Sequence, residues 1–324
     1  MKRPLFLALG AAVAASGFTV NAAESFSPIL GYYTKDVPAG PSTMVIGLVK
    51  KKDHQGGMDN QGAFSVSEGM TTVVEDDRDM TTVPLDNHYM EILDGMWEGL
   101  ILDIEAGSGT TNSFKVNADL TAFPGIALDS TFAIREHATL GDLFPDGGGF
   151  AKDNDFVIPF DSAGNPTFYT WDGAAWNAGG TPANDKVIYP GQGFLIIAAE
   201  AREVLVGKNG VSHVKENRTM IPFYAAAGLN LVGPPNPVVG KNHELGNMGF
   251  VGSIAKDNDF VIPFTDDGLL NPLGFYTSDD VIMNEGGSDA SAVGVEVGTA
   301  VLLIGSADGY YTAPALDASL LQDQ

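Results

Sequence analysis

The chain has 324 residues and no cysteine, with 41 acidic against 17 basic residues and a formal net charge of −24. The lack of cysteine excludes disulfide scaffolds, thiol catalysis and cysteine-ligated zinc or iron–sulfur sites. The negative charge argues against nucleic acid as a partner, because nucleic-acid-binding proteins present basic surfaces to phosphate. With 44% hydrophobic residues the chain can form cores, and it is long enough for two or three domains.

The first 22 residues are typical of a secretory signal peptide. Lys2 and Arg3 form a basic start, residues 4–15 an apolar core, and Val20-Asn21-Ala22 a small-residue cleavage site. The apolar core is shorter than the ~20 residues that span a bilayer, and we expect no transmembrane segment in the mature chain. We therefore expect export through a cleaved signal peptide, to the periplasm, the cell surface or the exterior.

Alternating apolar and polar residues predict antiparallel β-strands along most of the mature chain. Residues 100–105, 114–117 and 131–135 alternate in this way. The continuous apolar runs 194–197 and 301–304 suggest strands buried on both faces. Gly-containing turn signals separate these stretches, and only short segments are typical of a helical turn. The sequence thus predicts an all-β protein of antiparallel sandwich or barrel-like modules.

An internal repeat is the strongest signal in the sequence. The ten residues Ala151–Phe160 recur without change as Ala255–Phe264. The match extends in order over 151–200 and 255–307, and its offset rises only from 104 to 107 residues. Small changes in loop length explain that drift. We interpret the pattern as a duplicated β unit of about a hundred residues rather than a solenoid of short repeats.

The repeat suggests a division of the chain into four parts. They are a signal peptide (1–22), an N-terminal β domain (23–136), a first β repeat unit (137–212) and a second β repeat unit (213–324). Residues 42–47, an apolar strand ending at a glycine, resemble 229–233. That similarity leaves an alternative open, in which each unit begins with this strand and about 55–136 are inserted into the first unit.

Several short motifs follow one another along the mature chain. They are Gly31-Tyr32-Tyr33-Thr34, Tyr89-Met90-Glu91-Ile92-Leu93 with Gly95, Glu98-Gly99-Leu100, Asp103-Ile104, Ile134-Arg135-Glu136-His137, Thr139-Leu140-Gly141-Asp142-Leu143-Phe144, Pro190-Gly191-Gln192-Gly193-Phe194 and Gly228-Leu229-Asn230-Leu231-Val232-Gly233. In this order they resemble a family of exported, β-rich bacterial proteins to which no activity is assigned. The resemblance covers nearly the whole mature chain and implies export and a β-rich fold. The second unit departs from the pattern, since it has neither tryptophan nor Pro-Gly-Gln-Gly.

The repeated Asp-Asn-Asp triplets are candidates for metal binding. Calcium takes six to eight hard oxygen ligands, commonly carboxylates and Asn carbonyls in loops. The EF-hand spacing is absent, and the same residues also suit a plain polar turn before a strand. Calcium is therefore the one cofactor that we consider. Its candidate ligands are Asp153, Asn154 and Asp155 in the first unit and Asp257, Asn258 and Asp259 in the second.

Aromatic residues gather on a hairpin around Asp172-Gly173. Exposed rings beside Asp and Asn can stack on sugars, so Tyr169, Trp171 and Trp176 are candidates for binding a polysaccharide. Alternation places Tyr169 and Trp171 on one strand face, which favours a core role instead. Trp97 is a second, weaker contact candidate. The other partner that we consider is an envelope protein.

The sequence offers no arrangement of residues that is specific for catalysis. The five histidines lack metal-ligand spacing, and there is no nucleophile elbow or phosphate-binding loop. Glu91, Glu98 and Asp103 could act as glycosidase carboxylates, but their spacing does not distinguish them from ordinary strand and loop acids. We expect a non-enzymatic structural or interaction protein of the bacterial cell envelope or exterior. The alternatives are a carbohydrate-binding module using the aromatic hairpin and, behind it, a glycoside hydrolase.

Overall fold

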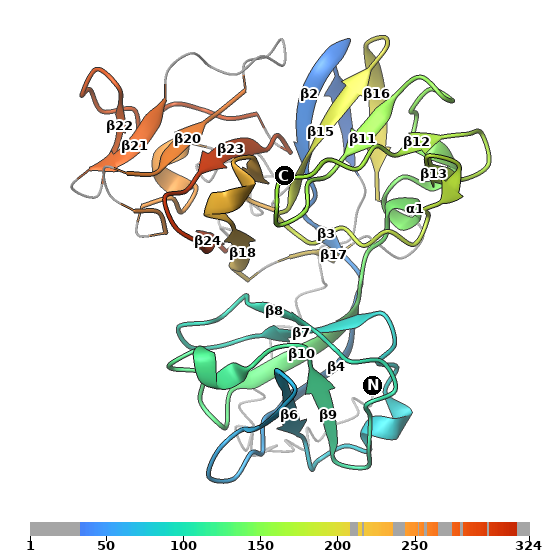
Figure 1. Cartoon of the computed structure of the whole chain (residues 1–324), viewed down its shortest axis with the longest axis vertical. Coiled ribbons are helices and arrows are strands. Elements are labelled where there is room, and N and C mark those ends of the chain that lie inside the picture. The colour runs from blue at the N-terminus through green and yellow to red at the C-terminus, as the bar shows by residue number, and fades with distance from the viewer. Residues whose placement is uncertain are drawn as a thin grey trace, which may run out of the picture.

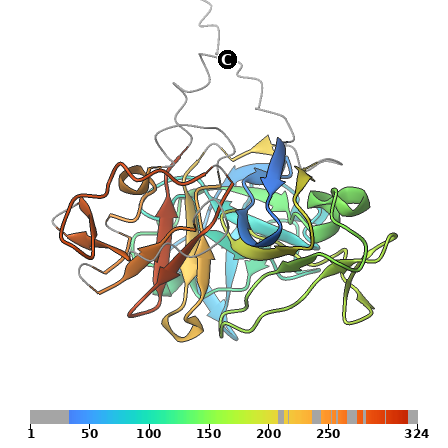
Figure 2. The same cartoon turned by 90° about the horizontal axis from the view of Figure 1, so that it is seen from above.

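The computed structural model describes residues 33–207, 213–215, 217–235, 244–251, 253–255, 258–264, 274–278, 281–296 and 298–315. The expected signal peptide lies outside these residues. The described chain is all-β, and none of its antiparallel sheets closes into a barrel. Its few helical elements are single turns, and no described helix is long and apolar enough to cross a membrane. The strands gather into three lobes (Figure 1), two of which lie side by side when the molecule is seen from above (Figure 2).

The split lobe is built from residues 33–49 and 138–206, two segments that are far apart in the sequence. Its sheet has the strand order β11-β15-β2, and β1 pairs with β16 beside it. A capping box between Thr139 and Asp142 begins its one α-helical turn. Its elements are β1 (Tyr33–Val37), β2 (Gly40–Val45), β3 (Leu48–Val49), α1 (Leu140–Leu143), η3 (Pro145–Gly147), β11 (Phe156–Ile158), β12 (Thr170–Trp171), β13 (Trp176–Ala178), β14 (Thr181–Pro182), β15 (Gly193–Ala198) and β16 (Arg202–Val206).

The C-terminal lobe, residues 219–313, contains a five-stranded sheet of order β19-β23-β20-β21-β22 and the pair β18-β24. A further strand, β17 (His213–Val214), precedes the lobe and pairs with β3 of the split lobe. The elements of the lobe are β18 (Thr219–Phe223), η4 (Ala225–Ala227), β19 (Asn230–Val232), η6 (Leu245–Asn247), β20 (Phe260–Ile262), β21 (Phe275–Ser278), β22 (Val281–Asn284), β23 (Val301–Ile304) and β24 (Gly309–Ala313).

The split and C-terminal lobes pair their strands in the same way. In the split lobe β15 lies between β2 and β11, and in the C-terminal lobe β23 lies between β19 and β20. The outer pair β1-β16 has its counterpart in β18-β24. β2 and β19 overlap the two similar segments, 42–47 and 229–233, that left the insertion alternative open. The boundaries of the units themselves stay a prediction.

The middle lobe, drawn from blue to green in Figure 1, is formed by residues 52–136. Its two sheets have the orders β4-β10-β7-β8 and β5-β6-β9, and side chains from both form one buried core that includes the contact between Phe114 and Phe132. Its elements are β4 (Lys52–Gly57), β5 (Ser65–Ser67), β6 (Met70–Val74), η1 (Met80–Thr82), β7 (His88–Ile92), β8 (Ile101–Asp103), β9 (Ser113–Val116), η2 (Leu120–Ala122) and β10 (Thr131–Glu136).

The predicted alternation is confirmed in β9, where Phe114 and Val116 are buried and Lys115 is exposed. The prediction of strands buried on both faces holds only in part. In β15 Leu195 is half-buried, and in β23 Ile304 is 38% exposed. Leu195 packs against an apolar cluster between the split and C-terminal lobes, so its burial depends on a neighbouring lobe.

The split and C-terminal lobes pack directly on each other. Val45 from the split lobe and Leu231, Ala300 and Leu302 from the C-terminal lobe form that shared buried cluster. Gly193 allows the close approach, because a Cβ atom at this position would lie 2.4 Å from the Cβ atom of Ala300. Residues of the middle lobe join these two lobes at one junction, where the cleft described below is found.

Candidate functional site

The aromatic hairpin proposed as a sugar site is mostly part of the split-lobe core. Trp176 is 0% exposed, and its indole nitrogen donates a hydrogen bond of 3.2 Å to the carbonyl oxygen of Phe144. Tyr169 is also buried, and Trp171 is half-buried with its ring centroid 6.1 Å from that of Trp176. Tyr169 and Trp176 therefore lack the exposed face that sugar stacking needs. The burial of Tyr169 agrees with the core role that strand alternation favoured, and sugar stacking on this hairpin is not supported.

Trp97, the fourth aromatic candidate, is half-buried and packs between two lobes. Its indole nitrogen donates to the carbonyl oxygen of Pro124 at 2.9 Å. Its ring meets Phe123 of the middle lobe and Tyr310 of the C-terminal lobe edge to face, with centroid separations of 5.0 and 5.8 Å. Trp97 thus forms part of the packing contact between the middle and C-terminal lobes.

Asp155, the last residue of the first Asp-Asn-Asp triplet, holds two backbone segments together through its carboxylate. Asp155 is 0% exposed. Its two carboxylate oxygens accept hydrogen bonds from the amides of Ala151 at 2.7 Å and Ala199 at 2.9 Å, and Arg202 forms an ion pair with it at 2.8 Å. Both oxygens are thereby engaged by the protein itself, which favours a structural role.

The second triplet repeats this arrangement. Asp259 is 2% exposed and accepts hydrogen bonds from the amides of Ala255 at 2.7 Å and Ser306 at 2.6 Å. Asp153, Asn154 and Asn258 are exposed, and Asp257 lies outside the described residues. The described residues contain no group of three or more acidic or histidine side chains that could hold a metal ion. Among the described residues, the structure therefore brings no set of calcium ligands together.

A buried charge cluster joins the middle lobe to the segment that follows β17. Glu91 on β7 is 1% exposed and lies between Arg135 on β10, at 3.1 Å, and Lys215. Lys215 also donates to the carbonyl oxygen of Arg218 at 3.1 Å. Burial alone would raise the pKa of Glu91, but Lys215 and Arg135 hold that pKa below its ordinary value. The carboxylate is therefore ionised and fully paired.

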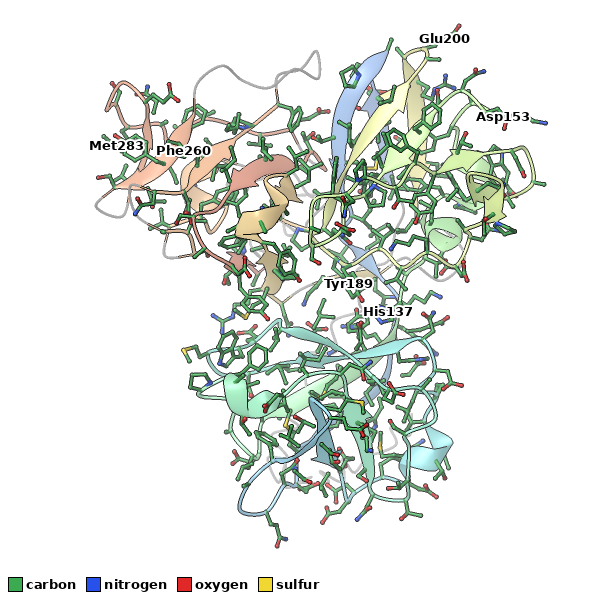
Figure 3. All side chains as sticks on the ribbon, viewed as in Figure 1. His137, Asp153, Tyr189, Glu200, Phe260 and Met283 are labelled. Carbon is green, nitrogen blue, oxygen red and sulfur yellow. The ribbon has the colours of Figure 1, made fainter. Side chains whose placement is uncertain are left out.

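A second polar contact ties the middle lobe to the split lobe. The Tyr189 hydroxyl lies 3.0 and 2.8 Å from the two carboxylate oxygens of Asp103 on β8, and His137 Nε2 lies 3.3 Å from one of them. Figure 3 places Tyr189 and His137 close together where the two lobes meet, and their ring centroids are 5.2 Å apart. Burial alone would raise the pKa of Asp103, but the hydrogen bonds from His137 and Tyr189 lower it.

A cleft of about 460 Å³ opens at this junction and is lined by all three lobes. Its wall combines aromatic rings, aliphatic side chains and a few polar groups, which is the usual character of a small-molecule site. The residues that matter for its chemistry are Asp103, Asn117 and Phe123 of the middle lobe, Tyr189 and Gln192 of the split lobe, and Tyr224, Leu229 and Tyr310 of the C-terminal lobe.

The sequence prediction missed most of this cleft. Two residues that the sequence analysis considered for a functional role lie here. Asp103 lines the cleft, and Trp97 packs behind the cleft wall against Tyr310. A signal was present, because the motifs at 98–100, 103–104, 190–194 and 228–233 all contribute lining residues. These motifs lie in three separate lobes, so only the tertiary structure shows that they meet. Comparison of the chain with protein-family models, with curated proteins and with solved structures finds no match.

Proposed function

We propose that this chain is an exported, non-enzymatic structural or interaction protein of the bacterial cell envelope or exterior, with the junction cleft as its binding surface. The observation that carries the proposal is the cleft itself, since all three lobes contribute to its wall. The buried ion pair Glu91–Lys215 and the partly exposed hydrogen-bonded pair Asp103–Tyr189 support a fixed arrangement of the lobes around it. The basic start, apolar core and cleavage site of residues 1–22 support export.

Binding is better supported than hydrolysis. A glycosidase needs one carboxyl group whose raised pKa keeps it protonated as the general acid. Glu91 and Asp103 have their pKa values lowered by their partners, and Glu98 forms an ion pair of 3.3 Å with Arg218. These pairings favour a structural use of all three acids over the glycoside hydrolase alternative.

Export is tested by expressing the full chain with a C-terminal epitope tag in a bacterial host. The expected product is found outside the cytoplasm, and its intact mass corresponds to a start near Ala22 or Ala23. Replacing Lys2 and Arg3 by glutamate should retain the protein in the cytoplasm, because the basic start is needed for targeting. A cytoplasmic wild-type product that keeps Met1 would refute export.

Use of the cleft is tested by photo-crosslinking in the exported protein. A photoreactive residue at Leu229, which is 43% exposed at the cleft, should give a discrete adduct with an envelope protein or glycan. The matched control is the same residue at Phe168, which is 49% exposed and is not among the residues that line the cleft. Equal adducts from both positions, or none from Leu229, would contradict the proposal.

A further inference from the structure

We infer that the junction cleft binds an uncharged sugar, of the size of one or two rings at the end of a glycan. This inference rests on the proposed function, because it names the chemical class that the cleft takes. It also moves sugar recognition away from the hairpin of Trp171 and Trp176, where the rings belong to the core. The volume of about 460 Å³ lies within the range of pockets for small organic ligands.

The aromatic part of the cleft comes from half-buried rings on all three lobes. Phe123, Tyr189, Tyr224 and Tyr310 each keep part of their surface accessible while the rest is packed. Tyr310 is fixed by Trp97 and Phe123, whose ring centroids lie 5.8 and 6.3 Å away. Such rings offer the apolar C–H faces of a sugar a firm surface and place a hydroxyl at its rim.

The backbone around Tyr224 is held in place by a neighbouring side chain. The amide and carbonyl of Tyr224 bond to the side-chain amide of Asn230 at 2.8 and 2.9 Å. Asn230 also donates to the carbonyl oxygen of Leu303, so Tyr224 is anchored to the central sheet of its lobe. A backbone that is already held in place loses little conformational freedom when a ligand binds.

The polar part of the cleft offers both donors and acceptors at a sugar's edge. Asn117 is exposed, and its side-chain amide forms no hydrogen bond within the described part of the chain. Gln192 accepts a hydrogen bond of 3.4 Å from the Tyr189 amide through its oxygen, which leaves its NH₂ group as a donor. Asp103 has 44% of its side chain exposed, and its carboxylate can accept further hydroxyl donors.

The charges of the cleft and of the whole chain disfavour an anionic ligand. A chain with a formal charge of −24 repels anions, and the cleft adds Asp103 and Asp161 against the single cation Lys186. Both carboxylates already receive hydrogen bonds from neutral donors. Asp103 accepts from Tyr189, and Asp161 accepts from the amides of Ala163 and Asn165 at 2.9 and 2.8 Å. Hydroxyl groups suit such a mixture of rings, amides and satisfied carboxylates.

The inference is tested by titration calorimetry of the exported protein with maltose, cellobiose, lactose and N,N′-diacetylchitobiose, and with glucuronic acid as an anionic control. At least one uncharged disaccharide should bind, and glucuronic acid should bind at least about tenfold more weakly. Asn117→Ala and Tyr224→Phe each remove one polar group and should weaken binding about three- to tenfold. Phe168→Ala, outside the cleft lining, should leave binding unchanged.

The inference would be overturned if no uncharged sugar binds, if glucuronic acid binds as tightly, or if neither cleft variant changes the affinity. Binding that is lost in Trp171→Ala but kept in Asn117→Ala would return the sugar site to the hairpin and also overturn it. Asn117 is exposed, so the Asn117→Ala variant is expected to fold. If the Tyr224→Phe variant does not fold, the affinity of Asn117→Ala alone decides the test. Adducts at Leu229 without sugar binding would refute the sugar and leave the proposed function standing.

Discussion

Lys215 and Glu91 form a buried ion pair between residues that are 124 positions apart in the chain. Lys215 is 3% exposed and Glu91 1% exposed, so the pair is almost fully removed from water. Arg135 completes the cluster from the neighbouring strand of the middle lobe. A buried charge that loses its partner is costly, and the cluster therefore makes the position of the middle lobe depend on a few side chains.

Glu91→Gln should lower the free energy of unfolding by about 3 kcal/mol at pH 7, because it leaves two buried cations without their carboxylate. The pKa of Glu91 is lowered in the folded state, so its contribution is fully present above the unfolded pKa of about 4.3 and is lost as the pH falls through the folded value. The difference between wild type and variant should therefore shrink toward about pH 3. Urea unfolding of wild type and Glu91→Gln at pH 7 and at about pH 3 measures this difference in the free energy of unfolding.

The matched control for that variant is Glu98→Gln. Glu98 pairs with Arg218, and both side chains are about 30% exposed, so the loss should stay below about 1 kcal/mol. Equal losses for Glu91→Gln and Glu98→Gln, or a Glu91→Gln effect that does not change with pH, would contradict the role given to the buried cluster.

Asp155→Ala should destabilise the split lobe by about 3 kcal/mol or more, because two backbone amides and Arg202 lose their acceptor. Asp153→Asn is the control in the same triplet. Asp153 is exposed with a φ of 58°, a conformation that asparagine also adopts, and we expect a change within about 0.5 kcal/mol. Thermal unfolding of Asp155→Ala and Asp153→Asn, each compared with wild type, measures the two changes in stability.

Chelation tests the calcium hypothesis directly. Since both oxygens of Asp155 and of Asp259 accept backbone amides, we expect EDTA to leave the thermal midpoint unchanged. A ligand that binds only the folded state raises its stability, so a midpoint that falls on chelation and is restored by calcium would contradict this expectation.

Trp176→Ala should lower the free energy of unfolding by about 3–5 kcal/mol, because it leaves a large cavity beside Phe144 and Phe150. Phe168→Ala provides the comparison, since this ring is 49% exposed and its removal should cost less than about 1 kcal/mol. Chemical denaturation gives both values. A small loss for Trp176→Ala would mean that the hairpin is not part of the core.

Gly99→Ala should disturb the contact between the middle lobe and the segment before β18. Gly99 has a φ of 88°, and a Cβ atom there would lie 2.2 Å from the carbonyl oxygen of Arg218. We expect a loss of more than about 2 kcal/mol from strain and displacement together. Gly95→Ala is the control, because its φ of 72° is similar but its Cβ atom would meet nothing within 4 Å.

The loss in Gly95→Ala should then be about 1–2 kcal/mol, from the backbone alone. Trp97, which packs between the two lobes, reports on this junction through its fluorescence. A shift of the emission in Gly99→Ala but not in Gly95→Ala is expected, whereas indistinguishable variants would contradict a close contact at Gly99.

Sequence reasoning was most successful where the structure depends on neighbouring residues. The alternation around Phe114 predicted which side chains of β9 are buried, because successive side chains of a strand point to opposite faces. It failed for Arg135, which alternation placed on a polar face and which is 8% exposed. The reason is that Glu91 and Lys215 cover this face, and neither lies near Arg135 in the sequence.

The sequence by itself determined the all-β class, the faces of regular strands, the acidic surface charge and the recurrence of ten identical residues. These follow from periodicity and composition, which are local properties. Only the tertiary structure decided that Trp176 belongs to the core, that Asp155 fastens a loop, and that Tyr189 meets Asp103 from 86 positions away. The cleft belongs to this second class, because its wall comes from three lobes and forms only when their chain segments pack together.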